Sequence, residues 1–347
     1  MSIKNRILFI GVGQGGGNIT NLFEKKGYAC TYINSSNHDL DTVDTDYSNK
    51  FHLTGADGCS MDIEKGEVLL KKHGSDIVDF ITNKYPNQDL IFVVHTDGGG
   101  TGAGIGPGLI DALTNILSDR YVGGISVVAA LDDTIQSIKN SAATWAKLTT
   151  IDKSAALFMI DNNKGSKLKL NRKFVELFDR AVNVTNPDKR GIIDNNEIFT
   201  LLTTPGLSVL LETYEEKDSG RIGIHNSVFV EYARSRDTIA GVSCKNRADI
   251  VKDVLEETVG YLKKTFSGYN EESDLIILSG LNQSKALMDE MVEIVTEKES
   301  EMDSEGFGTL TNPFAKETSS RVNGFVATEQ RSTKKRDKKS ILKNYFN

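Results

Sequence analysis

The feature that most constrains this fold is a glycine-rich run at residues 95–104, which reads HTDGGGTGAG. Four consecutive apolar residues precede it at 91–94, and an apolar stretch compatible with a helix follows at 109–113. An apolar run, a glycine turn and a helix in this order indicate a buried parallel strand that leads through a loop into a helix. Glycines let the backbone approach a ligand closely, and a helix N-terminus adds positive potential, so this loop suits a polyphosphate.

In chain order, the run at 95–104 is the second glycine loop. The first glycine loop lies near the start of the chain, where the strand-like residues 7–10 are followed by GVGQGGGN at 11–18. This loop also fits the G-x-G-x-x-G pattern of dinucleotide-binding proteins. That fold needs an acidic residue at the end of its second strand to bind a ribose hydroxyl. Here the second strand, 29–33, ends in the segment 34–36 (NSS), and the first acid is Asp39. A nicotinamide-dependent oxidoreductase is therefore only a remote alternative.

The sequence contains no G-x-x-x-x-G-K-[ST] motif, so the phosphates would be held by backbone amides from several loops. The run GGGTGAG closely resembles the GGGTG[ST]G signature of the tubulin and FtsZ superfamily and differs from it only at Ala103. The first loop is similar to the GVGGGGGN of FtsZ, and Gln14 stands where tubulins also carry a glutamine. The resemblance implies that the nucleotide is GTP or GDP, bound with Mg²⁺.

The resemblance also implies which residues contact the nucleotide. They come from both glycine loops and from the ends of neighbouring strands and helices: Gly13, Gln14, Gly15, Gly16, Asn18, Asn34, Gly58, Gly98, Gly99, Gly100, Thr101, Gly102, Gln136, Asn140, Asn183 and Asn186. Gly58 belongs to the segment 54–62, which lies where FtsZ has its third loop, the one that senses the γ-phosphate.

Two of these positions follow the predicted strand near residue 130. Gln136 and Asn140 have the spacing of a Glu and an Arg that FtsZ places near the ribose. The alternative is an ordinary helix N-terminus capped by Asp132 or Asp133.

A long helix is predicted after Asn186-Pro187, because Asn is a favoured N-cap and Pro suits the first helical position. It would run over 187–204 and stop at Pro205. In the tubulin superfamily such a central helix leads to a second domain, and an Asn near its start reads the guanine edge. Asn183 and Asn186 both compete for that role, and the alternative for Asn186 is the N-cap itself.

The family keeps its catalytic acids in the loop after this helix, where they touch the nucleotide of the next subunit. Glu212 and Glu215 preserve two acids three positions apart, which would share one face if a helical turn followed. Their role would be to orient a water molecule for attack on the γ-phosphate. The alternative is a solvated acidic loop, because two more acids lie close by in the sequence.

The order of elements predicts an α/β fold with a parallel sheet and ligands at the carboxyl ends of its strands. The predicted strands are 6–10, 29–34, 90–95, 124–130 and 155–160, and the helices between them are 17–26, 62–83, 104–118 and 135–148. A smaller α/β domain would contain strands 222–224, 228–230 and 275–278 and helices 247–264 and 284–300. The predicted divisions are a GTPase domain (1–186), the central helix (187–204), a C-terminal domain with the co-catalytic loop (205–300), and a helix end, linker and flexible basic tail (301–347).

Composition excludes several other classes of protein. The three cysteines are scattered without ligand spacing, so neither a disulfide scaffold nor a zinc site is expected. No apolar run is long enough to span a bilayer and no cleavable signal is visible, so we expect a cytoplasmic protein without membrane contacts. The tail Arg331–Asn347 carries seven basic residues and one acid, which suits a polyanion or an acidic partner.

Within the superfamily, the sequence resembles the TubZ proteins of plasmids and phages more than cell-division FtsZ. This resemblance implies longitudinal contacts between copies of the chain, polymerisation with GTP, and hydrolysis at the subunit interface in a host bacterial cytoplasm. It also implies that the filament segregates plasmid or phage DNA through a DNA-bound adaptor, and we expect the tail 331–347 to bind that adaptor. The alternative is an FtsZ-like filament that divides membranes or positions cargo without DNA.

Overall fold

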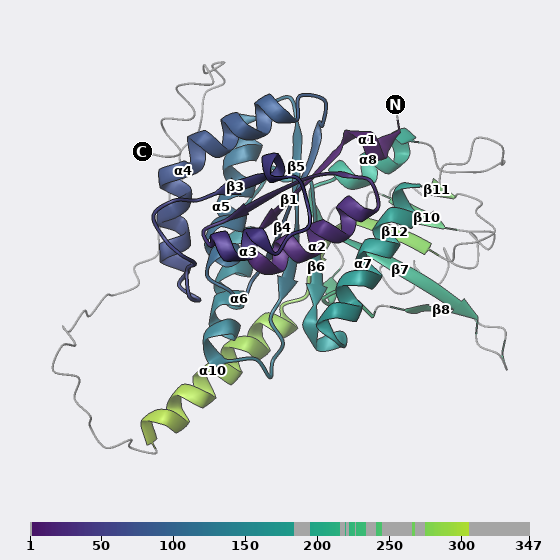
Figure 1. Cartoon of the computed structure of the whole chain (residues 1–347). Helices are drawn as coiled ribbons and strands as arrows, with labels where there is room; N and C mark the ends of the chain where they lie inside the picture. Colours follow the sequence, from purple (N-terminus) through teal and green to yellow (C-terminus); the bar gives the residue numbers. More distant parts are fainter. Residues whose placement is uncertain are drawn as a thin grey trace, which may run out of the picture.

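The computed structural model describes residues 2–183, 195–215, 219, 222–225, 227–233, 241–244, 266–267 and 275–304. The start of the predicted central helix, the predicted helix 247–264 and the basic tail 331–347 lie outside these residues. The described part is an α/β fold built on one large sheet (Figure 1).

The first half alternates strands and helices as predicted. Its elements are α1 Ile3–Arg6, β1 Ile7–Val12, α2 Gly13–Lys25, β2 Ala29–Asn34, α3 Asn37–Asp41, β3 Lys50–His52, α4 Ile63–Lys84, β4 Leu90–Thr96, α5 Thr101–Ile116, β5 Tyr121–Val128, α6 Ile135–Leu148, β6 Ala156–Asp161 and α7 Lys167–Val182. The second half contains α8 Asn195–Thr203, β7 Gly206–Glu215, β8 Ile222–His225, β9 Tyr232–Ala233, β10 Gly241–Cys244, β11 Phe266–Ser267, β12 Leu275–Gln283 and α10 Ala286–Ser304.

The sheet has the order β11-β10-β12-β7-β6-β5-β4-β1-β2-β3. Every neighbouring pair from β3 to β7 is parallel, which confirms the predicted parallel α/β sheet. β7 pairs with β6 at only two positions and then runs antiparallel to β12, so β7 joins a parallel half to an antiparallel half. This pairing does not test the predicted domain boundaries, which stay predictions.

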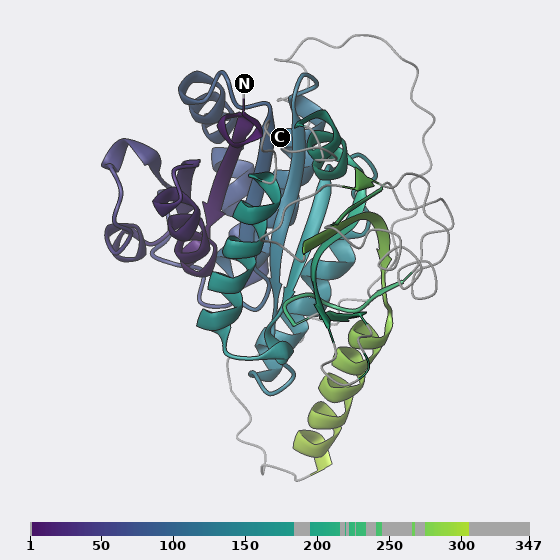
Figure 2. The same ribbon diagram turned by 90° about the vertical axis from the view of Figure 1, so that its right-hand side faces the viewer.

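The two faces of the parallel half are covered by different helices. Phe92 on β4 points into an aromatic cluster with α2 and α7, whereas His95, three residues along the strand, faces Gly106 on α5. The cluster consists of Phe9, Phe23, Phe92, Phe158, Phe174 and Phe178. α4 and α6 flank α5 on the other face, and α10 packs along α6 and projects from the body of the molecule (Figure 2).

Several boundaries differ from the predictions. α2 and α5 begin inside the glycine loops, at Gly13 and Thr101, and α7 was not predicted at all. The predicted strand 228–230 is present only as a single bridge between Phe229 and Ile160. Residues 206–215, expected as a loop, form β7, because β12 and β8 supply partners on both sides that no local pattern reveals.

Candidate nucleotide site

The N-termini of α2 and α5 meet at the carboxyl ends of β1 and β4. Gly13 opens α2 with φ +70°, and a Cβ there would lie 3.1 Å from the backbone N of Gly102 and 3.4 Å from Cβ of Thr101. A side chain at Gly13 would therefore be strained and would crowd the second loop. Two helix N-termini at one edge concentrate free N–H groups and positive potential there, which is an anion-binding arrangement.

The neighbouring glycines allow the backbones to pack closely. A Cβ on Gly16 would lie 2.1 Å from the carbonyl oxygen of Val94, and one on Gly15 would lie 2.3 Å from Cγ2 of Thr96. The first turn of α2 therefore rests directly on β4. Gly15 and Gly16 are needed for this packing, whatever else they contact.

The predicted third segment lies against the second glycine loop. A Cβ on Gly100 would be 2.7 Å from Cβ of Cys59 and 2.9 Å from the backbone N of Met61. Ser60 and Met61 have positive φ angles of 48° and 66°, a conformation that side chains rarely adopt and that clusters at functional sites. Gly58 has open space around its Cα, with nothing within 4 Å of a built Cβ.

Ser35, which the sequence reasoning did not select, links these loops. Its hydroxyl shares a hydrogen bond with that of Thr101 (3.2 Å) and lies 3.7 Å from Sγ of Cys59. Its carbonyl oxygen accepts from the backbone N of Gly58 at 3.4 Å. Ser35 is fully buried just after the end of β2. A small hydroxyl residue directly after an apolar strand is the sequence signal that could have identified it as a site residue.

Asn140 on α6 holds the second and third loops together. Its buried Nδ2 donates to the carbonyl oxygens of Met61 (2.8 Å), Gly98 (3.3 Å) and Gly99 (3.3 Å). Its Oδ1 accepts from Nε2 of Gln136 at 2.9 Å. Asn140 therefore links the second and third loops, and Gln136 bonds Asn140; a ribose contact by either residue stays a prediction.

The start of α6 is capped by neither of the two predicted aspartates. The N-cap is Thr134, whose hydroxyl accepts from the backbone N of Ser137 at 3.2 Å. Asp133 instead accepts from the backbone N of Ala130 and pairs with Lys167. A cavity of about 450 Å³ lies beside this helix start and is lined by Ser60, Met61, Asp62, Ile63, Glu64, Gln136 and Asn140.

Comparison with known proteins agrees with this geometry. The family described as Tubulin/FtsZ family, GTPase domain matches residues 6–168, the part that contains the loops described above. The tubulin-like protein TubZ of Clostridium botulinum C phage is 29% identical over 306 residues, which is 85% of this chain and 84% of that protein.

Residues 6–168 of this chain therefore form a GTPase domain of the tubulin/FtsZ family.

Solved structures extend the likeness beyond the GTPase domain. The crystal structure of Clostridium botulinum phage c-st TubZ superposes with a TM-score of 0.75 at 25% identity, covering 86% of this chain and 99% of that one. A GTPγS-bound protofilament of CetZ2 from Haloferax volcanii gives a TM-score of 0.67 at 16% identity, covering 85% and 99%, which shows a common fold.

Some predicted contacts of the GTPase domain are available to a ligand. Gln14 and Asn18 are exposed on the first turns of α2, and neither side chain has a partner among the described residues. Gly98 and Gly99 are half-buried, and the nearest atom to a Cβ on Gly99 would be 3.9 Å away. These four positions are therefore at least partly accessible from solvent.

The predicted asparagines are distributed differently. Asn34 is buried, accepts from the backbone N of Ser36 at 3.2 Å and donates to Asp39 at 3.3 Å. Asn183 ends α7, where its amide donates to the carbonyl and carboxylate oxygens of Asp179 at 2.8 and 2.9 Å. Asn186 lies outside the described residues, so the choice between Asn183 and Asn186 stays open.

A buried ionisable pair, which the sequence reasoning did not select, lies beneath the second glycine loop. His95 and Asp97 are both fully buried, and Nδ1 of His95 lies 3.1 Å from Oδ1 of Asp97. Ser126 donates to the same oxygen at 2.6 Å, and Oδ2 of Asp97 has no partner. Burial raises the pKa of Asp97, and His95 and Ser126 offset only part of that effect.

The predicted co-catalytic acids are on a strand. Glu212 lies on β7, where Oε2 is 2.6 Å from Nζ of Lys173 and Oε1 accepts from Arg180 at 2.9 Å. The argument that Glu212 and Glu215 share one face required a helical turn, so it does not apply here. It failed because strand pairing with β12 fixes this backbone. Of Glu215 only the backbone, at the end of β7, is described.

Two kinds of feature are absent from the described part of the chain. None of its helices is long and apolar enough to cross a membrane. Within the same residues, no group of three or more His, Cys, Asp or Glu side chains could hold a metal ion.

Proposed function

We propose that this chain is a filament-forming GTPase that acts in the host cytoplasm. It binds GTP or GDP where α2 and α5 meet, polymerises head to tail, and hydrolyses GTP where one subunit contacts the next. The family match supports the nucleotide, and the similarity to protofilament structures of CetZ2 and of Bacillus thuringiensis TubZ supports self-association.

The observation that carries this proposal is the contact between Gly13 and Gly102. This contact brings the N-termini of two glycine-containing helices together at the edge of the sheet. The segment 58–62 packs against Gly100 of the second loop at the same edge. Backbone amides and helix dipoles at such a point replace the lysine of a P-loop as phosphate ligands.

The hydroxyls near this edge also fit Mg²⁺. Mg²⁺ is commonly held by one or two protein oxygens together with substrate phosphates and water. Thr101 presents a partly exposed hydroxyl oxygen beside the glycine loop, 3.2 Å from that of the buried Ser35, and it is the residue that would hold the ion. When bound, Mg²⁺ would neutralise part of the phosphate charge.

Glu212 and Glu215 remain our candidates for the acids that act on the nucleotide of the adjoining subunit. For Glu212 this role requires that assembly release its carboxylate from Lys173 and Arg180. Alanine at either position would leave GTP binding by the monomer unchanged and give filaments that persist. If both variants disassemble as fast as the wild type, these acids have no catalytic role.

We further propose that the filament moves plasmid or phage DNA through an adaptor bound to the tail 331–347. The support is the charge of the tail and the similarity to the phage protein TubZ. Deleting 331–347 would leave polymerisation intact and abolish capture of adaptor-coated DNA. Undiminished capture by the truncated chain would favour a filament that works without DNA.

Light scattering and phosphate release with GTP, ATP and a non-hydrolysable GTP analogue test the main proposal. We expect assembly with GTP and with the analogue, phosphate release with GTP only, and neither with ATP. Assembly that is indifferent to the nucleotide would refute the proposal.

Two substitutions locate the site. Asn18→Ala would weaken GTP binding. Asn83→Ala, at another exposed asparagine near the C-terminal end of α4, would not change it. Thr101→Ala would retain nucleotide but slow hydrolysis, because a hydroxyl beside the phosphates is lost. Normal turnover by Thr101→Ala would show that Thr101 is only a turn residue.

A further inference from the structure

A second cavity lies on the sheet face that carries α6 and α10. Its volume is about 550 Å³, within the range of small-molecule sites. It is bounded by the end of α6, the connection that leads into β6, the first residues of β7, and the corner where β12 turns into α10. None of the glycine-loop residues lines it.

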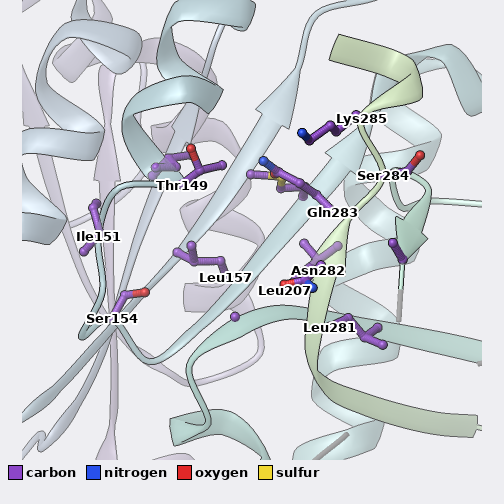
Figure 3. Close-up of a pocket in the computed structure, with 14 residues that line it drawn as sticks. Thr149, Ile151, Ser154, Leu157, Leu207, Leu281, Asn282, Gln283, Ser284 and Lys285 are labelled. Atoms are coloured by element: carbon purple, nitrogen blue, oxygen red, sulfur yellow. The ribbon is translucent and has the colours of Figure 1, made fainter. Parts of the chain in front are cut away.

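Most of the cavity wall is apolar. Figure 3 shows Leu157, Thr149 and Ile151 on one side of the space, across from the β12 residues Leu281, Asn282 and Gln283. Leu157, Leu207 and Leu281 come from β6, β7 and β12, so strand pairing alone holds these three in place. A preformed apolar wall of this kind favours a ligand with an apolar body.

A single positively charged side chain, that of Lys285, lies at the rim of the cavity. Lys285 is the only charged residue among those that line the cavity, and it makes no ion pair with any described residue. Its amino group and the amide of Gln283 both point from the β12 corner toward the Thr149 side of the cavity (Figure 3). Lys285 also directly precedes the N-terminus of α10, which adds positive potential, while the C-terminal end of α6 opposite is negative.

These features favour one orientation for a ligand. An anionic group would lie against Lys285 and Gln283 beside the start of α10, and an apolar body would cover the leucines. A bare inorganic anion would leave that wall in contact with water, and a cation would face Lys285. We propose that this cavity is a second binding site, for a small molecule with an apolar body and one carboxylate group.

Calorimetric titration of the full chain with decanoate, without nucleotide, tests this proposal independently of GTP binding. We expect one decanoate per chain, weaker binding of decyl alcohol, and no binding of decyltrimethylammonium. Lys285→Gln would weaken decanoate binding about tenfold and leave decyl alcohol unchanged, as expected when a single charge-assisted contact is lost. Equal binding of all three probes, or none, would overturn the proposal.

Neighbouring threonines give a matched pair for blocking the cavity. Thr149 lines it and Thr150 does not, and both side chains donate to the carbonyl three residues earlier. Thr149→Trp would abolish decanoate binding, whereas Thr150→Trp would preserve it, with circular dichroism confirming that both fold. Equal effects would contradict the site. Binding that appears only after deletion of 331–347 would identify the tail as the occupant and would also overturn the proposal.

Discussion

Two regions of this molecule each remove a carboxylate from water, with opposite results. Beneath the second glycine loop, Asp97 is fully buried and has only Ser126 and His95 beside one of its oxygens. Burial raises the pKa of Asp97. On β7, burial alone would also raise the pKa of Glu212, but Lys173 and Arg180 outweigh it and hold the pKa below its ordinary value.

The difference reflects how each region is held together. The loop region is positioned by close backbone packing, with glycines where a side chain would collide. Its acid, Asp97, has His95 and Ser126 beside one carboxylate oxygen and no partner on the other. In the β7 region strand pairing fixes the backbone, and side chains add a charged link, because Glu212 ties the strand to two basic residues of α7. Substitutions should therefore act through backbone contact in the first region and through charge in the second.

The largest effect is expected for Gly16→Ala. Its Cβ would lie 2.1 Å from a backbone oxygen of β4, so α2 would have to shift, at a cost of about 3 kcal/mol or more of unfolding free energy. Gly17→Ala is the matched control, because the nearest atoms to its Cβ are 3.8 Å away and alanine favours a helix by about 0.5–1 kcal/mol. Urea unfolding of both variants measures the difference. Similar stabilities would show that packing against β4 does not constrain the loop.

Asn140→Ala should have the next largest effect. Three loop carbonyls and the amide of Gln136 lose a buried partner, which costs about 2 kcal/mol and loosens the second and third loops. GTP affinity should fall with stability. Asn115→Ala serves as the control, since Asn115 bonds only within α5, to Asp111. An Asn140 variant with normal GTP affinity would mean that the loops hold their shape without it.

Glu212→Gln should cost less, about 1 kcal/mol at neutral pH, because the Glu212 side chain is still partly exposed to water. The pKa of Glu212 is lowered by folding, so its contribution is present above the ordinary carboxyl range and is lost as the pH falls through the folded pKa. The stability gap between wild type and variant should therefore close as the pH falls below the ordinary carboxyl range. Glu176→Gln, at an exposed acid on the same helix as Lys173 and Arg180, is the control and should change the stability little at neutral pH.

The smallest effect, and one of opposite sign, is expected for Asp97→Asn. Because folding raises the pKa of Asp97, its contribution is present at low pH and is lost as the pH rises above about 4. The variant has no titratable group at position 97, so it does not lose this stability as the pH rises. The melting temperature of the variant minus that of the wild type should therefore increase with pH. Parallel melting curves for the two proteins across pH 4–8 would show that Asp97 stays ionised, paired with His95.

Local patterns were sufficient for much of the fold. Each predicted strand of the parallel half is present, because apolar runs bounded by glycine turns have few other ways to be buried. The glycine loops lie at one edge because parallel strands bring their carboxyl ends together. The two helices that follow the glycine loops, α2 and α5, begin earlier than predicted, since glycine weakens a helix in isolation but permits close contact with the sheet.

Contacts between distant segments decided the rest. The loops are linked by Ser35 and Asn140, whose partners lie 24 to 79 residues away along the chain. Glu212 came to lie on a strand because β12 pairs with β7 across more than 60 residues, and its cationic partners stand on a helix that the sequence did not reveal. The sequence by itself determined where backbone must come close to backbone, because only glycine permits that approach. Which side chains meet was decided only by the tertiary structure, since an ion pair or a buried amide has no local pattern when its partners come from separate elements.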